Sequence, residues 1–507
     1  MRPALPDEGF PTHAAPINVA QAPSVRRTLV LAACLMATFM AAVESSIIAT
    51  AMPTIVADLG GFSLFSWAFA VYLLTQAVSI PVYGRLADIY GRKKVFYAGA
   101  GLFLVGSILC GFARSMVMLI LFRALQGFGA GGVQPIATTI LGDIYTPTER
   151  AHVQGLVSSI FGIAAVLGPL LGAFLVEQVG WPLVFWVNIP IGIAAIAMIA
   201  VFLQEPAGHN PRRIDYAGSL LLMLSMTALM LVLVQGGSLP FSTLAVIGVI
   251  CLSMLVALVV HEATTPEPML PLDLWHQHRI IAVGSFGGAV ISAVMTGVSA
   301  FLPTYVQGAM GRSALAGGLV LGAMSVTWAI ASFLGGRLMV RTTYRLTAVV
   351  GTLALIAGSA VLITLTPERG VVWASSGSLL IGIGMGLCNT TFIVSIQAAV
   401  PWHQRGAATS SCMFLRFVGQ SLGAAAFGAV LNFTLLRRAP GAENMVNQLL
   451  EPSQRDALPA GELIRLTDVV ALGLHNTYLL AGVLSVIALG FALLLPARLS
   501  PAMQGRT

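Results

Sequence analysis

Charged residues are scarce in this chain of 507 residues: Asp, Glu, Lys and Arg together make up 9% of it, against about 25% in an average soluble domain. Hydrophobic residues make up 57%, and the mean hydropathy is +0.89. A water-soluble core cannot absorb this much apolar sequence, so we expect a polytopic membrane protein. The net charge of +7 does not indicate nucleic-acid binding, because the basic residues stand singly or in short clusters between apolar runs.

Cysteine is also scarce, and clusters of catalytic or metal-ligating residues are lacking. The five cysteines all lie inside apolar runs with no metal-site spacing, so we interpret them as small buried hydrophobes. The eight histidines are scattered, and no segment has the composition of a soluble catalytic domain. A membrane sensor or enzyme is therefore the remotest class of function, and we expect no metal and no organic cofactor.

Long apolar runs are what the chain does contain. We count fourteen runs of about 20 residues, each bounded by charge, proline or glycine. They predict an all-α polytopic protein with two six-helix bundles and two extra central helices, a recurring transporter plan. The expected parts are a cytoplasmic tail (1–27), an N-terminal bundle (28–204), a linker with the two extra helices (205–279), a C-terminal bundle (280–495, with a long outer loop at 435–470) and a cytoplasmic tail (496–507).

Lys and Arg predict the orientation. They concentrate in the connections on the side of the N-terminus, so we expect both termini in the cytoplasm and a multi-pass protein of the cell (inner or plasma) membrane. A faint internal repeat supports two related halves. Gly-Arg-Leu occurs at 84–86 and again at 336–338, at the same point of each six-span unit.

The connection after the second run reads GRLADIYGRKK (84–94). Gly84 and Gly91 permit a tight turn, and Asp88 adds a negative charge that a simple positive anchor does not explain. The stretch resembles the G-x-L-A-D-x-x-G-R-K loop of the major facilitator superfamily. The resemblance implies that Arg92 bridges Asp88 and Asp143, in a charge network that latches the two halves together on the cytoplasmic side.

Further motifs resemble one branch of that superfamily. Residues 123–132 read RALQGFGAGG and match R-x-x-Q-G-x-G-A, while 181–192 (WPLVFWVNIPIG) and 212–218 (RRIDYAG) resemble the fourteen-span drug:proton antiporters of the EmrB/QacA type. The resemblance runs from about residue 28 to 495, without motifs in the 435–470 segment. It implies the major facilitator fold and proton-driven export.

The fifth run reads AAVLGPLLGAFL (164–175). Ala164, Gly168 and Gly172 form a stripe of small residues, and Pro169 is expected to bend the helix. Helix packing alone would explain such a stripe. The antiporters of the superfamily carry G-P-x-x-G at this place, and the resemblance implies that the bend belongs to an exporter.

Glu44, in the stretch FMAAVESSIIATAMP (39–53), is the one acid that we place deep in a span. At 1.5 Å per residue it lies roughly 13 Å inside Pro53, and Arg123 lies roughly 12 Å inside the outer end of its own span. An intramembrane acid is functional by default, a lone structural Glu being the alternative. The related branch carries Asp here, one methylene shorter.

The family fold places the first and fourth spans side by side, so we hypothesise that Glu44 and Arg123 share one electrostatic site. Desolvation raises the pKa of a carboxylate and a nearby cation lowers it, so a balanced pair can gain and lose a proton. Candidates for the substrate cavity, chosen by position and polarity, are Tyr72, Gln126, Gln134, Phe161, Asn389 and Arg416. Arg416 either bonds to carbonyls or Asn389, or meets polar groups of the substrate and disfavours permanent cations.

The sequence therefore predicts a proton-coupled exporter of lipophilic drugs, a multidrug efflux protein that would confer antibiotic resistance. A dedicated exporter of an endogenous metabolite, lipid or siderophore is the alternative with the same mechanism. The expected partners are a small lipophilic substrate, protons and the lipid bilayer, with no nucleic acid. The proton gradient supplies the energy, no cofactor is needed, and we expect a monomer.

Overall fold

The computed structural model describes residues 24–145, 147–204, 215–235, 239–265, 275, 278–400, 405–438, 449, 455 and 458–496. These residues form helices and their connections, with fourteen spans that are long and apolar enough to cross a membrane. The all-helical architecture and the number of spans confirm the fold predicted from the sequence.

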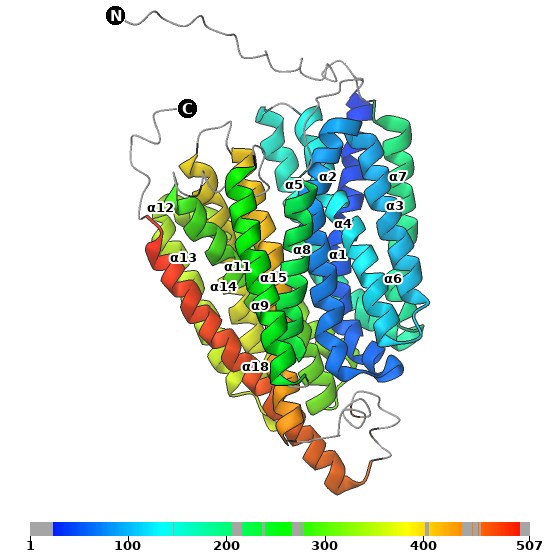
Figure 1. The fold of residues 1–507 in the computed structure, drawn as a ribbon, viewed down its shortest axis with the longest axis vertical. Helices are drawn as coiled ribbons and strands as arrows, with labels where there is room; N and C mark the ends of the chain where they lie inside the picture. The colour runs from blue at the N-terminus through cyan, green and yellow to red at the C-terminus, as the bar shows by residue number, and fades with distance from the viewer. Residues whose placement is uncertain are drawn as a thin grey trace, which may run out of the picture.

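The N-terminal half, drawn from blue to teal in Figure 1, holds the first six spans. These are α1 (Ser24–Leu59), α2 (Phe65–Tyr90) after the short helix η2 (Phe62–Leu64), α3 (Arg92–Gly111), α4 (Met116–Ile144), α5 (Pro147–Gln178), and a sixth span made of α6 (Pro182–Trp186) and α7 (Asn188–Phe202).

Two extra helices, α8 (Tyr216–Gln235) and α9 (Phe241–Thr264), follow before the C-terminal half. That half consists of α11 (Arg279–Thr304) continued by η3 (Tyr305–Ala309), α12 (Ala314–Arg341), α13 (Tyr344–Ile363), η4 (Pro367–Arg369) with α14 (Gly370–Ala399), α15 (Arg405–Arg438) and α18 (Ala460–Leu494).

The two faces of the bundle can be named from its first and last helices. α1 begins and α18 ends at the same face, uppermost in Figure 1, which we call the terminal face. The opposite face, where α1 ends and α18 begins, is the distal face. The sequence predicts that the terminal face is cytoplasmic.

Several helices extend beyond the apolar runs from which they are predicted. α1 begins at Ser24 although its apolar run begins at 28, and α18 begins at Ala460, inside the segment 435–470 predicted as an outer loop. Counting apolar residues stops at the first charges, whereas backbone hydrogen bonds continue a helix past the hydrocarbon region. The acid in the first turn of α18, Glu462, suits a helix N-terminus electrostatically.

The turn between α2 and α3 corrects one expectation. Gly91 has φ of 91° and ψ of 150°, a backbone conformation that favours glycine, and α3 begins directly after it. Gly84 does not form the turn, because α2 continues through it to Tyr90. A single glycine suffices here, since helix α2 can run to the residue before the turn.

A triplet of alternate glycines gives each half the same internal construction. The triplets are residues 127, 129 and 131 in α4 and residues 382, 384 and 386 in α14. In each triplet, a Cβ on the first or third glycine would lie 2.2–2.7 Å from a backbone oxygen of the second helix of its half, α2 or α12. A Cβ on the middle glycine would lie 2.3–2.6 Å from backbone atoms of the third helix, α3 or α13. The absence of side chains thus lets α4 and α14 pack closely on both neighbours.

The extra helices lie outside the two bundles, at their junction. α8 packs on α2 of one half and on α15 of the other, while α9 packs mainly on α8 (Figure 1). Most of the α9 surface is exposed, as expected for a helix that faces lipid. These helices are central in the sequence but peripheral in the fold.

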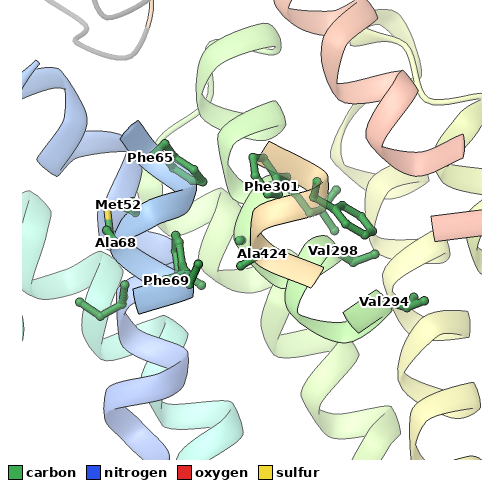
Figure 2. Packing of buried hydrophobic residues seen from close by; sticks show 14 of the residues in the cluster. Met52, Phe65, Ala68, Phe69, Val294, Val298, Phe301 and Ala424 are labelled. Carbon is green, nitrogen blue, oxygen red and sulfur yellow. The ribbon is translucent and has the colours of Figure 1, made fainter. Parts of the chain in front are cut away.

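The two halves meet along pairs of helices, α2 with α15 and α5 with α12, and α1 approaches α11. Figure 2 shows the apolar part of this contact, with Phe65 of α2 facing Phe301 of α11; their ring centroids are 5.1 Å apart. Hydrogen bonds join Asn432 Nδ2 to the Ser63 oxygen (2.7 Å) and Ser421 Oγ to the Ala70 oxygen (2.7 Å). We call this contact the distal seam.

Glycines allow the distal seam to close tightly. A Cβ on Gly428 of α15 would lie 2.1 Å from Ser66 Oγ of α2, and a Cβ on Gly318 of α12 would lie 2.8 Å from the Pro169 oxygen of α5. Four hydrogen bonds between described residues of the two halves lie toward the distal face. The halves are therefore held together from that side.

Candidate functional site

Helix α1 carries Glu44 into the interior of the N-terminal half, where its carboxylate meets two donors. Arg123 of α4 donates from a guanidinium nitrogen to Oε1 at 2.5 Å. Asn188, the first residue of α7, donates from Nδ2 to Oε2 at 2.5 Å. The exposed fraction is 0% for Glu44 and 2% for Arg123, so this ion pair is withdrawn from solvent. The ionised carboxylate therefore has a donor on each oxygen.

Arg123 is held by α4 itself and by α2. Its guanidinium donates to Gln126 Oε1 at 2.8 Å and to the Ala68 oxygen at 3.2 Å. It also lies over the ring of Tyr72, 4.0 Å from the ring centroid, where the aromatic face attracts a cation. These contacts supply the partners that an Arg inside a membrane span requires.

A second layer of polar side chains positions the first. Gln126 Nε2 donates to Ser107 Oγ of α3 at 2.9 Å, and Asn188 Nδ2 lies 3.2 Å from the same oxygen. Ser107 in turn donates to the Phe185 oxygen of α6 at 3.0 Å. The network is fully buried and draws on each of the six spans of the half except α5.

The sequence does not single out Asn188 and Ser107 as site residues. Asn188 stands in the motif at 181–192, but a motif match does not tell which side chain it meets. No sequence pattern marks Ser107 as a site residue, because a serine in a membrane helix usually bonds to the backbone of its own helix. Only the packing of α3 against α4 through Gly106, where a Cβ would lie 2.6 Å from the Gln126 Cα, brings Ser107 to the network.

The small-residue stripe of α5 packs directly on α1. Ser46 Oγ, two residues after Glu44, donates to the Ala164 oxygen at 3.2 Å. A Cβ on Gly168 would lie 1.9 Å from Ser46 Oγ, and one on Gly172 would lie 2.4 Å from Thr50 Oγ1. Pro169 stands inside the continuous helix α5, and its backbone oxygen faces Gly318 of α12. Helix α5 thus touches the acid-bearing helix on one side and the C-terminal half on the other.

At the terminal face, Arg92 Nε lies 2.7 Å from Asp143 Oδ2 and forms an ion pair between α3 and α4. Both residues belong to the N-terminal half, so this pair by itself does not join the two halves. The next residue, Lys93, donates to the Ala200 and Leu203 oxygens at the end of α7 (2.7 and 2.8 Å). The predicted contact of Arg92 with Asp88 involves a side chain that lies outside the described part of the structure.

Reversing the charges of this pair tests its contribution. Arg92→Asp would bring two carboxylates together and is expected to lower the free energy of unfolding by about 1 kcal/mol, because both groups are partly exposed. The double variant Arg92→Asp/Asp143→Arg should recover most of this loss. Thermal unfolding of the purified variants measures both effects, and a double variant no more stable than the single one would contradict the pairing.

Sequence comparison assigns the family. The model of the Major Facilitator Superfamily matches residues 34–424, most of the chain. The chain belongs to the Major Facilitator Superfamily. It is therefore a membrane transporter and not an enzyme, and it is related to multidrug and efflux transporters.

Two relatives within the superfamily come from Bacillus subtilis (strain 168). The multidrug transporter protein MdtP is 34% identical over 438 residues, covering 86% of this chain and 79% of its own length. Multidrug resistance protein 3 is 32% identical over 472 residues, covering 90% and 92%. Among solved structures, a bacterial homolog of the human lysosomal transporter Spinster has a TM-score of 0.70, at 20% identity, over 94% of this chain and 100% of the other. This last likeness concerns the fold.

The residues predicted to line a substrate cavity differ in their burial. Tyr72 and Gln126 are buried in the Glu44 network, and the Tyr72 hydroxyl has no hydrogen-bond partner among the described residues. Gln134 of α4, Phe161 of α5 and Asn389 of α14 are half-buried. Arg416 of α15 is also half-buried, and no hydrogen bond to Asn389 or to a carbonyl is among its contacts.

Where α8 begins and α9 ends, the structure shows a polar contact that the sequence does not reveal. Asp215 accepts from the Gly218 backbone nitrogen at 2.8 Å and lies 2.7 Å from His261 Nε2. Glu262, beside His261, is buried at the end of α9. In this superfamily protein the D-x-x-G motif at 215–218 thus caps α8 and ties it to α9, which gives the motif a structural role.

Proposed function

We propose that the protein is a proton-coupled antiporter that exports lipophilic compounds across the cytoplasmic membrane. The observation that carries the proposal is the buried ion pair of Glu44 and Arg123, 2.5 Å apart. Among the ion pairs of the described residues, it is the one in which both side chains are almost completely withdrawn from solvent. A buried carboxylate of this kind is a natural proton carrier in a transporter.

The pair can couple a proton to a change of state. Ionised Glu44 neutralises Arg123 and accepts from Asn188, so the carboxylate and the guanidinium both have partners in this form. When Glu44 takes up a proton, the countercharge disappears and Arg123 remains as an uncompensated buried cation, which is costly. The protein can lower this cost by rearranging the helices around the pair. Binding of cargo in the other state would favour loss of the proton and the return.

Helix α5 is the element that would transmit the rearrangement. It contacts Ser46 and Thr50 of α1 through Gly168 and Gly172, and its Pro169 backbone oxygen contacts α12 at Gly318. A shift of α1 is therefore passed to α5 by direct contact of backbone and small side chains, and from α5 to the other half.

The distal seam supports a conformation in which the halves part at the terminal face. We infer that this face is cytoplasmic, because basic residues such as Arg26, Arg27 and the cluster Arg92, Lys93 and Lys94 gather there. The structure would then represent the inward-facing state of an alternating-access cycle.

Expression of the protein in an efflux-deficient bacterial host tests the proposal. Cells that express the protein should tolerate several lipophilic toxic compounds better than cells with the empty vector. Everted membrane vesicles should accumulate a fluorescent lipophilic substrate when their lumen is acidic, and should lose it when the pH gradient is collapsed with nigericin. Accumulation that is insensitive to nigericin would contradict proton coupling, and protection against none of the compounds would favour a dedicated exporter of a cell metabolite.

A further inference from the structure

No described residue forms an ion pair with Arg416. It stands on α15, eleven residues from the beginning of the helix at Arg405, or roughly 16 Å along its axis. Its Nε atom is buried and has no hydrogen-bond partner, and no ion pair with the guanidinium is present among the described residues. This contrasts with Arg123, whose guanidinium meets a carboxylate, an amide, a carbonyl and an aromatic ring.

No described acid lies near this depth in the C-terminal half. Between residues 274 and 442 the sequence contains one acid, Glu368, and it lies in η4 at the distal face. Glu462 and Asp468 lie in the first turns of α18, also toward the distal face. In the N-terminal half, the acid closest to such a depth, Glu44, is already paired with Arg123. Among the described residues, the positive charge of Arg416 therefore meets no acid.

The stem of Arg416 is fixed against α11, which limits where the guanidinium can move. A Cβ on Gly288 of α11 would lie 3.4 Å from Arg416 Cγ and 3.8 Å from Cys412 Sγ, one turn earlier on α15. One turn further on, a Cβ on Gly419 would lie 2.3 Å from the Ala289 oxygen. The two helices are thus closely packed around the stem of Arg416.

A fixed, unneutralised cation in a low-dielectric region is a strong attractor for an anion. Arg416 is half-buried, so part of its hydration has already been lost in folding, and an incoming carboxylate gains a charge-assisted, bidentate contact. Residues with such an uncompensated charge inside the membrane commonly mark a substrate pathway. We propose that Arg416 binds the anionic group of the cargo, and that the protein exports amphiphilic organic acids, with a carboxylate on a lipophilic body.

This inference rests on the proposed export function and narrows its substrate class. The Arg416 guanidinium supplies the selective contact, and the apolar surroundings accept the lipophilic body. Outward movement of an organic anion is also favoured by a membrane potential that is negative inside. Permanent cations are expected to be poor cargo, because they would meet a like charge at Arg416.

Three probes with one lipophilic body and different head groups test the proposal: pyrenebutyric acid, its neutral methylamide, and a pyrenyl trimethylammonium. Binding to the purified protein is followed by pyrene fluorescence. We expect the acid to bind at least about tenfold more tightly than the amide, a difference of about 1.4 kcal/mol. Arg416→Met should abolish this preference, and Arg416→Lys should retain part of it. Arg337→Met, on α12 where Arg337 stacks on Phe333, is the matched control and should leave the preference intact.

Thermal unfolding separates this role from a structural one. Arg416→Met removes an uncompensated charge and should leave the midpoint of unfolding unchanged or raise it, whereas loss of a structural contact would lower it. Equal binding of acid and amide by the unmodified protein would overturn the inference, as would an unchanged preference in Arg416→Met. If phosphatidylglycerol, and not the acid probe, lost affinity in Arg416→Met, the site would belong to a lipid headgroup and the assignment to cargo would fall.

Transport of the neutral amide distinguishes the inference from the function on which it rests. Arg416→Met proteoliposomes should still transport the amide in response to a pH gradient. If the unmodified protein transports none of the three probes in response to a pH gradient, the proposed function fails. If it transports the amide and the acid equally well, the export function stands and the inference about Arg416 fails.

Discussion

Glu44→Gln is expected to reduce pH-gradient-driven export to the background of membranes without the protein. Glutamine keeps the shape of the side chain and can accept a hydrogen bond from Arg123, but it can neither carry a proton nor compensate the guanidinium charge. Accumulation of a fluorescent substrate in everted vesicles measures the loss. Glu462→Gln in the first turn of α18 is the matched control and should transport normally.

A destabilised variant would also fail to transport, so the single substitution needs a companion. Glu44→Gln leaves Arg123 as a buried, unpaired charge, which typically costs about 3–5 kcal/mol of stability. Neutralising both partners in Glu44→Gln/Arg123→Gln should recover most of that stability while export stays at background. Thermal unfolding and vesicle transport on the same preparations separate the two effects. Full transport by either variant would show that the pair does not carry the proton.

Glu44→Asp retains the carboxylate and shortens its arm. The donors on Arg123 and Asn188 both lie 2.5 Å from the Glu44 oxygens, so an Asp reaches them only if α1 shifts. We expect export that remains dependent on the pH gradient but is slower than in the unmodified protein. The related branch of antiporters carries Asp at this position, and loss of pH dependence in Glu44→Asp would argue against a role for the carboxylate itself.

Adding a methyl group to a glycine of the distal seam is expected to have the second large effect. In Gly428→Ala the new Cβ would lie 2.1 Å from Ser66 Oγ, and in Gly318→Ala it would lie 2.8 Å from the Pro169 oxygen. Overpacking of this kind costs roughly 1–3 kcal/mol, which corresponds to a population shift of about 5- to 150-fold. The state with a closed distal seam should therefore lose population, and export should slow.

Spin labels across the seam can measure this shift directly. Val179 and Arg312 are exposed at the distal face in opposite halves, and the five native cysteines are buried, so a cysteine pair at these positions can be labelled selectively. The label distance should increase in Gly318→Ala and Gly428→Ala. Gly322→Ala, one turn from Gly318 with no atom within 4 Å of its Cβ, is the control and should leave the distance unchanged. An unchanged distance in all three variants would contradict the role of the seam.

Features that depend on composition and depth along one helix could be predicted from the sequence. The fourteen apolar runs correspond to the fourteen spans, because a membrane span requires a long apolar stretch wherever it lies. The similar depths of Glu44 and Arg123 follow from counting residues along two helices, and the structure brings the two side chains to 2.5 Å.

Features that depend on three-dimensional packing could not be predicted. Ser107 and Asn188 join the Glu44 network only because glycines bring the helices together, and their sequence positions do not announce it. The contacts of Gln126 with Arg123 on its own helix and with Ser107 on α3 could not be read from the sequence either. Gly84 was expected in a turn, yet a glycine near a helix end can remain helical when a second glycine makes the turn.

Proton release on substrate binding is the measurement that tests the coupling pair most directly. Purified protein in unbuffered detergent solution, with a pH-sensitive dye, reports protons released when an exported compound is added. The account predicts release by the unmodified protein and none by Glu44→Gln/Arg123→Gln, although the double variant remains folded. Equal proton release from the two proteins would contradict it, because the proton would then come from another group.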